Sequence, residues 1–233
     1  AEAAVKLIDE GNTIPFIARY RKEATGSLND EVLRNLDERL KYLRNLEERK
    51  EQVINSIREQ EKLTPELEKK ILAASTLVAV EDLYLPYRPK RKTRASIAKE
   101  KGLEPLANLV LMQLTKTPLL KEAEHYISEE KGVLTAEEAL NGAKDILAER
   151  IAETAEYRTY IRKATFQEGS LDSSARDGNA ESVYEMYYNF TEPVKKAAGH
   201  RILALNRGEK EKILTVKITA PEEKILRYLE KKV

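Results

Sequence analysis

Apolar residues recur at every third or fourth position over a long stretch in the first quarter of the chain. The stripe consists of Leu33, Leu36, Leu40, Leu43 and Leu46, and it resumes with Val53, Ile54 and Ile57 after the polar run 47–52. This spacing indicates one face of an α-helix. Gly26 breaks the chain before it, and Ser27 or Asn29 can cap it. We therefore predict one helix over residues 29–61, roughly 50 Å long, along which shorter helices must pack.

Those shorter helices are predicted by a recurring order of capping residue, proline and apolar residues. Thr64-Pro65 and Thr117-Pro118 each place a capping side chain before a proline, which suits the first helical turn. Thr135 opens a capping box, and a second helix over 155–166 follows the one that it begins. The pair resembles a helix-turn-helix, and ordinary helix packing is the alternative.

Two apolar segments near the C-terminus predict β-structure. Residues 201–205 read R-I-L-A-L, and residues 213–219 read I-L-T-V-K-I-T, with apolar and polar residues alternating in the second. We predict that they form an antiparallel hairpin over residues 201–219. The polar stretch 168–179 is predicted to be a loop, and 182–198 a helix.

The predicted fold class is therefore mainly α: an elongated multi-helix assembly organised on one long helix, with a small antiparallel β-hairpin. We divide it into three regions. Residues 1–130 carry the long helix and a basic loop, residues 131–199 the helix-turn-helix-like pair, and residues 200–233 the hairpin with a short C-terminal helix.

Charge and composition exclude several classes of protein. The chain has 41 basic and 40 acidic residues, so any affinity for nucleic acid must come from local clustering. It has no cysteine, which excludes disulfides and thiolate chemistry. No apolar run approaches the ~18 residues of a membrane helix, and no signal peptide is visible. We expect a cytoplasmic protein without membrane contact.

No catalytic residue is predicted. The only histidines, His125 and His200, stand far apart in the sequence and lack the spacing of metal ligands. No glycine-rich phosphate loop precedes a helix. We therefore expect no metal, no cofactor and no enzymatic activity.

The densest positive charge lies between Tyr84 and Lys101, where seven basic residues face one acid. Pro86 and Pro89 favour extended geometry, which predicts a stiff loop rather than a helix face. The flanking Tyr84 and Tyr87 can fix this loop to the core or stack on a base. A rigid cationic loop beside aromatic residues is typical of a phosphate contact, and a solvated loop is the alternative. The predicted nucleic-acid contacts are Arg88, Lys90, Arg91, Lys92, Arg94 and Lys99.

Five further basic residues form a secondary predicted set. Arg19, Arg21 and Lys22 follow the predicted core residues Phe16 and Ile17, and pairing with acids of the next helix is the alternative for them. Arg158 and Arg162 lie on one side of the second helix of the helix-turn-helix-like pair. That helix lacks a set of side chains suited to base edges, which favours ordinary packing there.

Four segments, in order, resemble the Tex family of bacterial transcription accessory proteins. Along the chain they are G-N-T-I-P-F-I-A-R-Y-R-K-E-A-T-G (11–26), D-L-Y-L-P-Y-R-P-K-R-K-T-R-A-S-I-A-K-E-K-G-L-E-P-L-A (82–107), E-E-A-L-N-G-A-K-D-I-L-A-E-R-I (137–151) and H-R-I-L-A-L-N-R-G-E (200–209). The resemblance implies a nucleic-acid-binding accessory role in transcription. It also implies an RNase H-like domain, helix-hairpin-helix elements and an RNA-binding OB-type barrel, and we expect all three to lie outside this chain. Because the chain starts at Ala1 inside an apparent helix, we expect a piece of a longer protein.

Two hypotheses of different class follow. In the first, the chain is a module that contacts the phosphates of RNA or DNA through its basic loop, without sequence specificity and weakly in isolation, because the resemblance places the strongest binding in the barrel. In the second, it is a non-catalytic helical scaffold that packs on the remaining domains of the same polypeptide or on the transcription machinery. We expect a monomer in either case.

Overall fold

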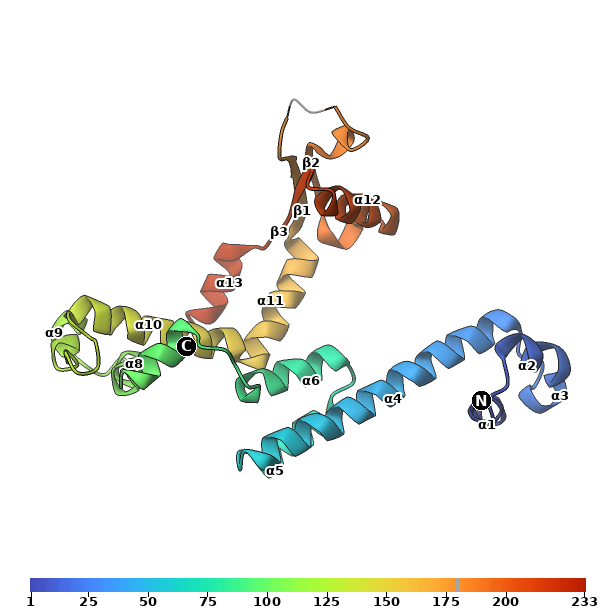
Figure 1. The fold of residues 1–233 in the computed structure, drawn as a ribbon, viewed down its shortest axis with the longest axis horizontal. Coiled ribbons are helices and arrows are strands. Elements are labelled where there is room, and N and C mark those ends of the chain that lie inside the picture. The colour runs from blue at the N-terminus through green and yellow to red at the C-terminus, as the bar shows by residue number, and fades with distance from the viewer. Residues whose placement is uncertain (179–180) are drawn as a thin grey trace. The chain divides into compact units, whose positions relative to one another are not determined.

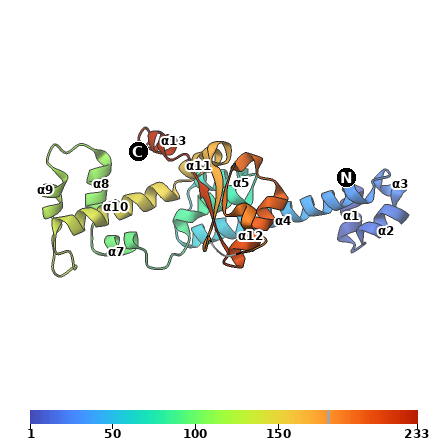
Figure 2. The same cartoon turned by 90° about the horizontal axis from the view of Figure 1, so that it is seen from above.

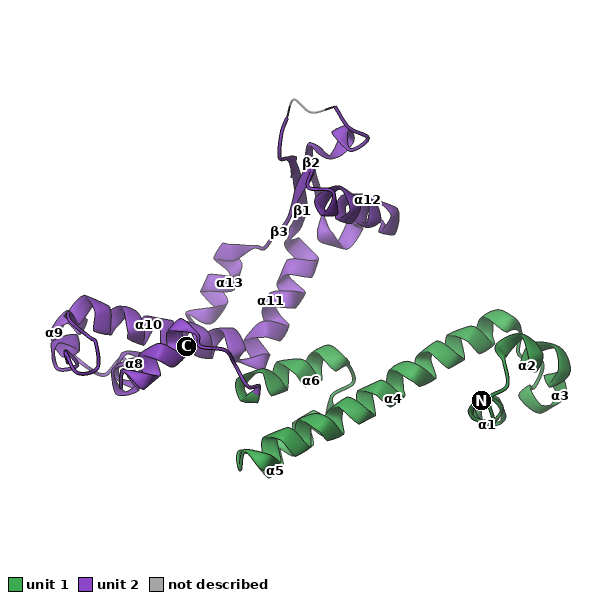
Figure 3. Ribbon diagram, viewed as in Figure 1, with its two compact units in different colours: residues 1–87 green, residues 88–233 purple. Residues whose placement is uncertain are grey.

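The computed structural model describes residues 1–178 and 181–233, and most of them are helical (Figure 1). The predicted fold class, mainly α with a small antiparallel sheet near the C-terminus, is confirmed. The chain forms two compact units, residues 1–87 and residues 88–233 (Figure 3). The division at residues 130 and 199 stays a prediction.

Unit 1 is organised on the predicted long helix. Its elements are α1 (Glu2–Asp9), α2 (Ile14–Tyr20), α3 (Lys22–Thr25), α4 (Asp30–Glu59), α5 (Pro65–Ala73), α6 (Leu77–Tyr84) and the 3₁₀ turn η1 (Leu85–Tyr87). Helix α4 begins one residue and ends two residues inside the predicted 29–61. Asn29 caps it, because its Oδ1 accepts a hydrogen bond from the backbone N–H of Val32 at 2.9 Å. Helices α1, α2, α5 and α6 all pack on α4.

The apolar stripe of α4 enters two separate cores. Leu33 packs with Ala4 and Ile17 near the start of the helix. Farther along, the stripe joins a second core with α5 and α6, whose buried members are Leu46, Val53, Ile54, Ile57, Ile71, Val80 and Tyr84. The prediction that Phe16 is a core residue is wrong, because its side chain is 37% exposed. Neighbouring helical residues point about 100° apart, and Ile17, which is fully buried, takes the inward direction.

Unit 2 begins with three helices packed on α10. Its helices are α7 (Arg94–Glu100), α8 (Glu104–Met112), α9 (Leu119–Glu124), α10 (Ala136–Glu153), α11 (Ala155–Glu168), α12 (Gly199–Lys210) and α13 (Glu222–Leu229). Helices α7, α8 and α9 contact α10 (Figure 2). Small residues allow the close approach: a Cβ at Gly142 of α10 would lie 2.4 Å from Cδ1 of Leu103. Half of the predicted capping box is present: Oγ1 of Thr135 accepts from the N–H of Glu138, whereas the Glu138 carboxylate accepts from the N–H of Leu134 and not from that of Thr135.

The second half of unit 2 contains a three-stranded antiparallel sheet. Its strands are β1 (Ser170–Ala175), β2 (Asn189–Pro193) and β3 (Leu214–Thr219), in the order β2-β1-β3. Leu171 of β1 lies opposite Glu192 of β2 and Ile218 of β3. The 3₁₀ turns η2 (Glu185–Tyr187) and η3 (Val194–Lys196) flank β2. Helix α12 packs on β3, where Leu205 and Leu214 join the buried core.

Three predictions for this half of unit 2 are wrong. The segment 201–205 is part of α12, because a helix buries Leu205 against Leu214 and Tyr184 while Ile202 and Leu203 stay exposed. The hairpin over 201–219 is therefore absent from the described residues, although its second strand, β3, was located correctly. Strand β1 occupies the predicted loop 168–179, of which residue 179 lies outside the described residues. Strand β2 occupies the predicted helix 182–198 and ends at Pro193 on the sheet edge, where a missing N–H is tolerated.

Candidate nucleic-acid interface

The tyrosines before the basic stretch belong to the core of unit 1. Tyr84 is buried, and its Oη lies 3.0 Å from Oγ of Ser56 on α4. The backbone oxygen of Tyr87 accepts a hydrogen bond from Nε2 of Gln60 at 3.0 Å. Of the two roles open to Tyr84, the structure shows the anchoring one.

The segment from Arg88 to Arg94, called the basic loop below, leads into α7. Residues 88–93 have no regular secondary structure, as predicted, but Arg94 is the first residue of α7, so the predicted loop is one residue too long. Thr93 and Ser96 form a reciprocal capping box at this boundary: Oγ1 of Thr93 accepts from the N–H of Ser96 at 3.0 Å, and Oγ of Ser96 accepts from the N–H of Thr93 at 2.8 Å. The capping box therefore sets the boundary between the basic loop and α7.

Two carboxylates of α10 bind the inner side of this segment. Glu149, whose side chain is 14% exposed, accepts hydrogen bonds from Thr93 at 2.9 Å and from Nζ of Lys99 at 3.2 Å. Nζ of Lys90 lies 3.4 Å from Glu149 and also pairs with Glu153. Burial raises the pKa of Glu149, but the hydrogen bonds from Thr93 and Lys99, with the charge of Lys90, outweigh it and hold the pKa below its ordinary value. Glu149 is therefore a carboxylate that organises three donors.

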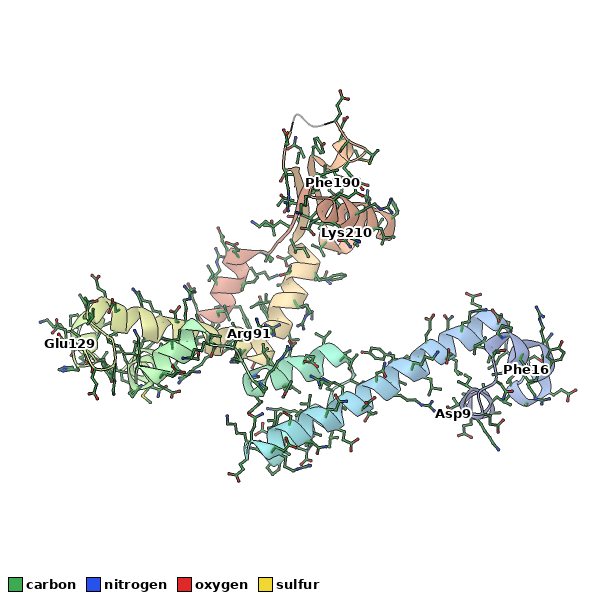
Figure 4. The ribbon with its side chains drawn as sticks, in the orientation of Figure 1. Asp9, Phe16, Arg91, Glu129, Phe190 and Lys210 are labelled. Carbon is green, nitrogen blue, oxygen red and sulfur yellow. The ribbon has the colours of Figure 1, made fainter. Side chains whose placement is uncertain are left out.

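The remaining predicted contacts face solvent. Arg88 and Arg91 are exposed, and no carboxylate of the described residues lies within ion-pair distance of either. Figure 4 labels Arg91. The side chain of Arg94 is 87% exposed, with Nε 3.6 Å from Asp145. That of Lys92 is 77% exposed, with Nζ 3.7 Å from Glu100. Ion pairs this long and exposed are weak, so these four cations can reach an external anion.

A cavity of about 310 Å³ adjoins Arg94 on the surface that α7 shares with α10. Its lining combines apolar side chains such as Ile97 and Leu103 with two cations, Arg94 and Lys101, and two carboxylates, Glu138 and Asp145. The charges balance, so the cavity is not selective for an anion.

The secondary residues fall into two different settings. Arg19, Arg21 and Lys22 are exposed in unit 1, and none of them pairs with an acid among the residues that the structure describes. In unit 2, Arg158 is half-buried and donates to the backbone oxygen of Ala152 at 3.2 Å. Arg162 is exposed.

Helices α10 and α11 are separated by Thr154 alone, and a helix-turn-helix role for them stays a prediction.

Two family models match the chain. The model of the Tex-like protein N-terminal domain matches residues 1–58, and the model described as Tex central region-like matches residues 115–232, just over half of the chain. The chain belongs to the Tex family.

Curated relatives agree with this assignment. YdcI of Bacillus subtilis is 50% identical over 100% of the chain, which covers 33% of YdcI. The transcriptional accessory protein Tex of Neisseria gonorrhoeae is 44% identical over 92% of the chain and 28% of its own length. The human S1 RNA-binding domain-containing protein 1 is 32% identical over 92% of the chain and 22% of its own length. The chain thus spans a third or less of each of these relatives.

In residues 1–178 and 181–233, no three His, Cys, Asp or Glu side chains come together as metal ligands would. Both His125 and His200 are exposed. Among the helices of the described chain, none is long and apolar enough to cross a membrane.

The sequence analysis of this Tex-family chain did not identify the carboxylates that bind Lys90 and Lys99. Glu149 and Glu153 lie four positions apart and therefore on one face of α10, which was the only available signal. Nothing in the sequence brings that face to residues 90–99, some 50 positions away. It also missed Tyr20, whose side chain is 66% exposed.

Proposed function

We propose that this part of a Tex-family protein contacts the phosphate backbone of nucleic acid through its basic loop. The observation that carries the proposal is the exposure of the guanidinium groups of Arg88 and Arg91, neither of which forms an ion pair with a described residue, with Lys92 and Arg94 beside them. A guanidinium group presents a planar fork of donors that matches two phosphate oxygens. Because only phosphates are addressed, the contact does not read sequence.

Lys90 and Lys99 have a different role in this proposal. Their ammonium groups are bound to Glu149 and Glu153, so in the unliganded protein they fix the loop on α10 rather than attract an anion. A loop fixed in this way loses little conformational entropy when it binds. The cost is that two of the six predicted cations are neutralised, which fits a weak contact.

We further infer a non-catalytic, cytoplasmic accessory role. Its support is the names of two relatives, one a transcriptional accessory protein and the other named for an S1 RNA-binding domain. In a polypeptide as long as these relatives, the part outside this chain would then supply most of the affinity for nucleic acid. The basic loop would add a second contact on the same nucleic acid. Linked contacts strengthen each other through effective concentration.

The test is a fluorescence-anisotropy titration of the chain with labelled single-stranded RNA and duplex DNA at several salt concentrations. The double variant Arg88→Ala/Arg91→Ala should bind about 5- to 30-fold more weakly, equivalent to a loss of about 1–2 kcal/mol. Its slope of log K against log salt should flatten by about 0.7–0.9 for each lost contact.

The matched control is Lys116→Ala/Lys121→Ala, which removes the same charge from exposed positions of unit 2. It should bind like the unaltered chain. Equal affinity and equal slope in the two double variants would refute the contact through Arg88 and Arg91.

The second candidate function is a scaffold, and one observation favours it. Lys90 and Lys99 already bind carboxylates of the same polypeptide, as a loop selected for intramolecular packing would. In that case Arg88 and Arg91 meet acidic groups of the remaining domains or of the transcription machinery. Absence of binding to RNA and DNA even at 20 mM salt, a condition of roughly 20 Å screening length, would support the scaffold against the nucleic-acid module.

A further inference from the structure

Helix α2 in unit 1 exposes two aromatic rings that a folded core would normally bury. The side chains of Phe16 and Tyr20 are 37% and 66% exposed. Their ring centroids lie 5.3 Å apart at an interplanar angle of 44°. One turn of helix separates them, so both rings belong to the same side of α2 (Figure 4, where Phe16 is labelled). Large aromatic surface is costly to leave in water, which marks this side of α2 as a contact surface.

Three cations accompany these rings. Arg19, Arg21 and Lys22 are exposed, and in the described part of the chain no acid pairs with them. The guanidinium carbon of Arg21 lies 5.4 Å from the centroid of the Phe16 ring, so the cation and the ring already share one surface. Glu23 is the single acid of residues 14–25, which leaves this segment with two net positive charges.

We propose that these five residues, Phe16, Arg19, Tyr20, Arg21 and Lys22, called the α2 patch below, bind single-stranded nucleic acid, with a base stacked on Tyr20 and the adjoining phosphates on the cations. The inference rests on the proposed nucleic-acid role and adds to it a second contact and a preference for unpaired strands. Aromatic stacking is available to every base, provided that the base is not already stacked and paired in a duplex.

Charge complementarity favours this ligand over an apolar protein partner. A protein surface that buried Phe16 and Tyr20 would also have to desolvate the Arg21 guanidinium beside them, which pairs with no acid among the described residues and is unfavourable to bury without a matching carboxylate. A nucleic acid provides phosphates at a regular spacing beside flat aromatic bases, so it satisfies the rings and the cations together.

The chain has no tryptophan, which allows a direct test. Tyr20→Trp keeps an aromatic ring at a mostly exposed position and introduces a single tryptophan. Its fluorescence should be quenched on titration with a single-stranded oligouridylate. An abasic oligodeoxynucleotide of the same length, which carries the phosphates without the bases, should not quench it. The control is Val183→Trp, at a site that is 87% exposed and lies between Glu181 and Glu185.

A second measurement separates this inference from the basic loop. Phe16→Ala/Tyr20→Ala should weaken binding of single-stranded RNA about 5- to 100-fold, with duplex affinity and the salt slope unchanged because no charge is removed. Arg88→Ala/Arg91→Ala should flatten the salt slope and leave the quenching of Tyr20→Trp in place at saturating ligand.

Four outcomes decide the matter. Quenching by the oligouridylate alone supports stacking at the α2 patch, whether or not the basic loop is also a contact. Equal quenching by the abasic strand shows phosphate binding without stacking and overturns the inference. The inference also fails if Tyr20→Trp is not quenched although anisotropy shows that the oligouridylate binds. Should no strand bind at all, the α2 patch and the basic loop are both refuted as nucleic-acid contacts.

Discussion

The basic loop and the α2 patch are both rich in cations, but different interactions hold them on their units. The α2 patch is attached by an apolar anchor, the fully buried Ile17, and its cations pair with no described acid. The basic segment is attached in part by ion pairs, with Lys90 and Lys99 bound to Glu149. The comparison shows that counting basic residues overestimates binding capacity wherever some of those charges fix their own segment. A cation remains available to a ligand when apolar packing, and not that cation, attaches the segment to its unit.

The largest expected effect concerns the apolar anchor. Ile17→Ala should lower the free energy of unfolding of unit 1 by about 2–5 kcal/mol, because it removes buried methyl groups from the core with Ala4 and Leu33 and leaves a cavity. Urea denaturation followed by far-ultraviolet circular dichroism measures it. A loss below about 1 kcal/mol would show that α2 is attached in some other way.

The corresponding change in the basic segment is Glu149→Ala. It deprives Thr93, Lys90 and Lys99 of a shared acceptor, and because both lysines can regain water the expected loss of stability is roughly 1–2 kcal/mol. Glu137→Ala, which removes an exposed carboxylate from the first turn of the same helix, is the control and should stay within about 0.5 kcal/mol. Equal losses in the two variants would contradict the anchoring role of Glu149.

The stabilisation by Glu149 should also depend on pH. The pKa of Glu149 is lower in the folded protein than its ordinary value of 4.5, so the unfolded chain binds the proton more tightly. The stabilisation is complete above pH 4.5 and is lost as the pH falls through the lower folded pKa. The stability difference between the unaltered chain and Glu149→Gln should therefore be constant from pH 7 to about pH 5.5 and shrink in more acidic buffer. If the stability difference between the two proteins were unchanged at pH 3, the stabilisation would not come from the ionised form of Glu149.

A smaller effect distinguishes the two kinds of cation within the basic loop. Arg91→Ala should flatten the salt slope of nucleic-acid binding by about 0.7–0.9, and Lys90→Ala by clearly less, because Lys90 is already neutralised by Glu149 and Glu153. Salt titrations of both variants against one RNA decide this. If Lys90→Ala flattened the slope as much as Arg91→Ala, the ion pairs of Lys90 would have to open on binding.

The smallest expected effect is the change in folding stability when an aromatic ring of the α2 patch is removed. Tyr20→Ala should change the free energy of unfolding by no more than about 0.5 kcal/mol, because the ring is mostly exposed and contacts mainly Phe16. Thermal and urea unfolding check it. A loss of 2 kcal/mol or more would mean that Tyr20 is a structural residue rather than a contact for a ligand.

Elements whose hydrogen bonds and caps are local were predictable from the sequence. Helix α4 was located within two residues at each end, because its period and its cap Asn29 lie within the helix itself. The cap Thr135, whose hydroxyl accepts from the N–H of Glu138, located the start of α10 in the same way. The cluster of cations after Pro86 was visible for the same reason, since charge density along the chain requires no fold.

Strand β1, the carboxylates beneath the basic loop and the exposed aromatic pair of α2 depended on tertiary structure. The residues of β1, S-L-D-S-S-A, are too polar to predict a strand alone, and they form one because β2 and β3 supply hydrogen bonds on both sides from far along the chain. In the same way Glu149 meets Lys90 and Lys99 only because α7 packs on α10. Local patterns determined the helices and the location of the charge. Packing between distant segments decided which of those charges remain free, because burial and pairing depend on neighbours that the linear sequence does not place.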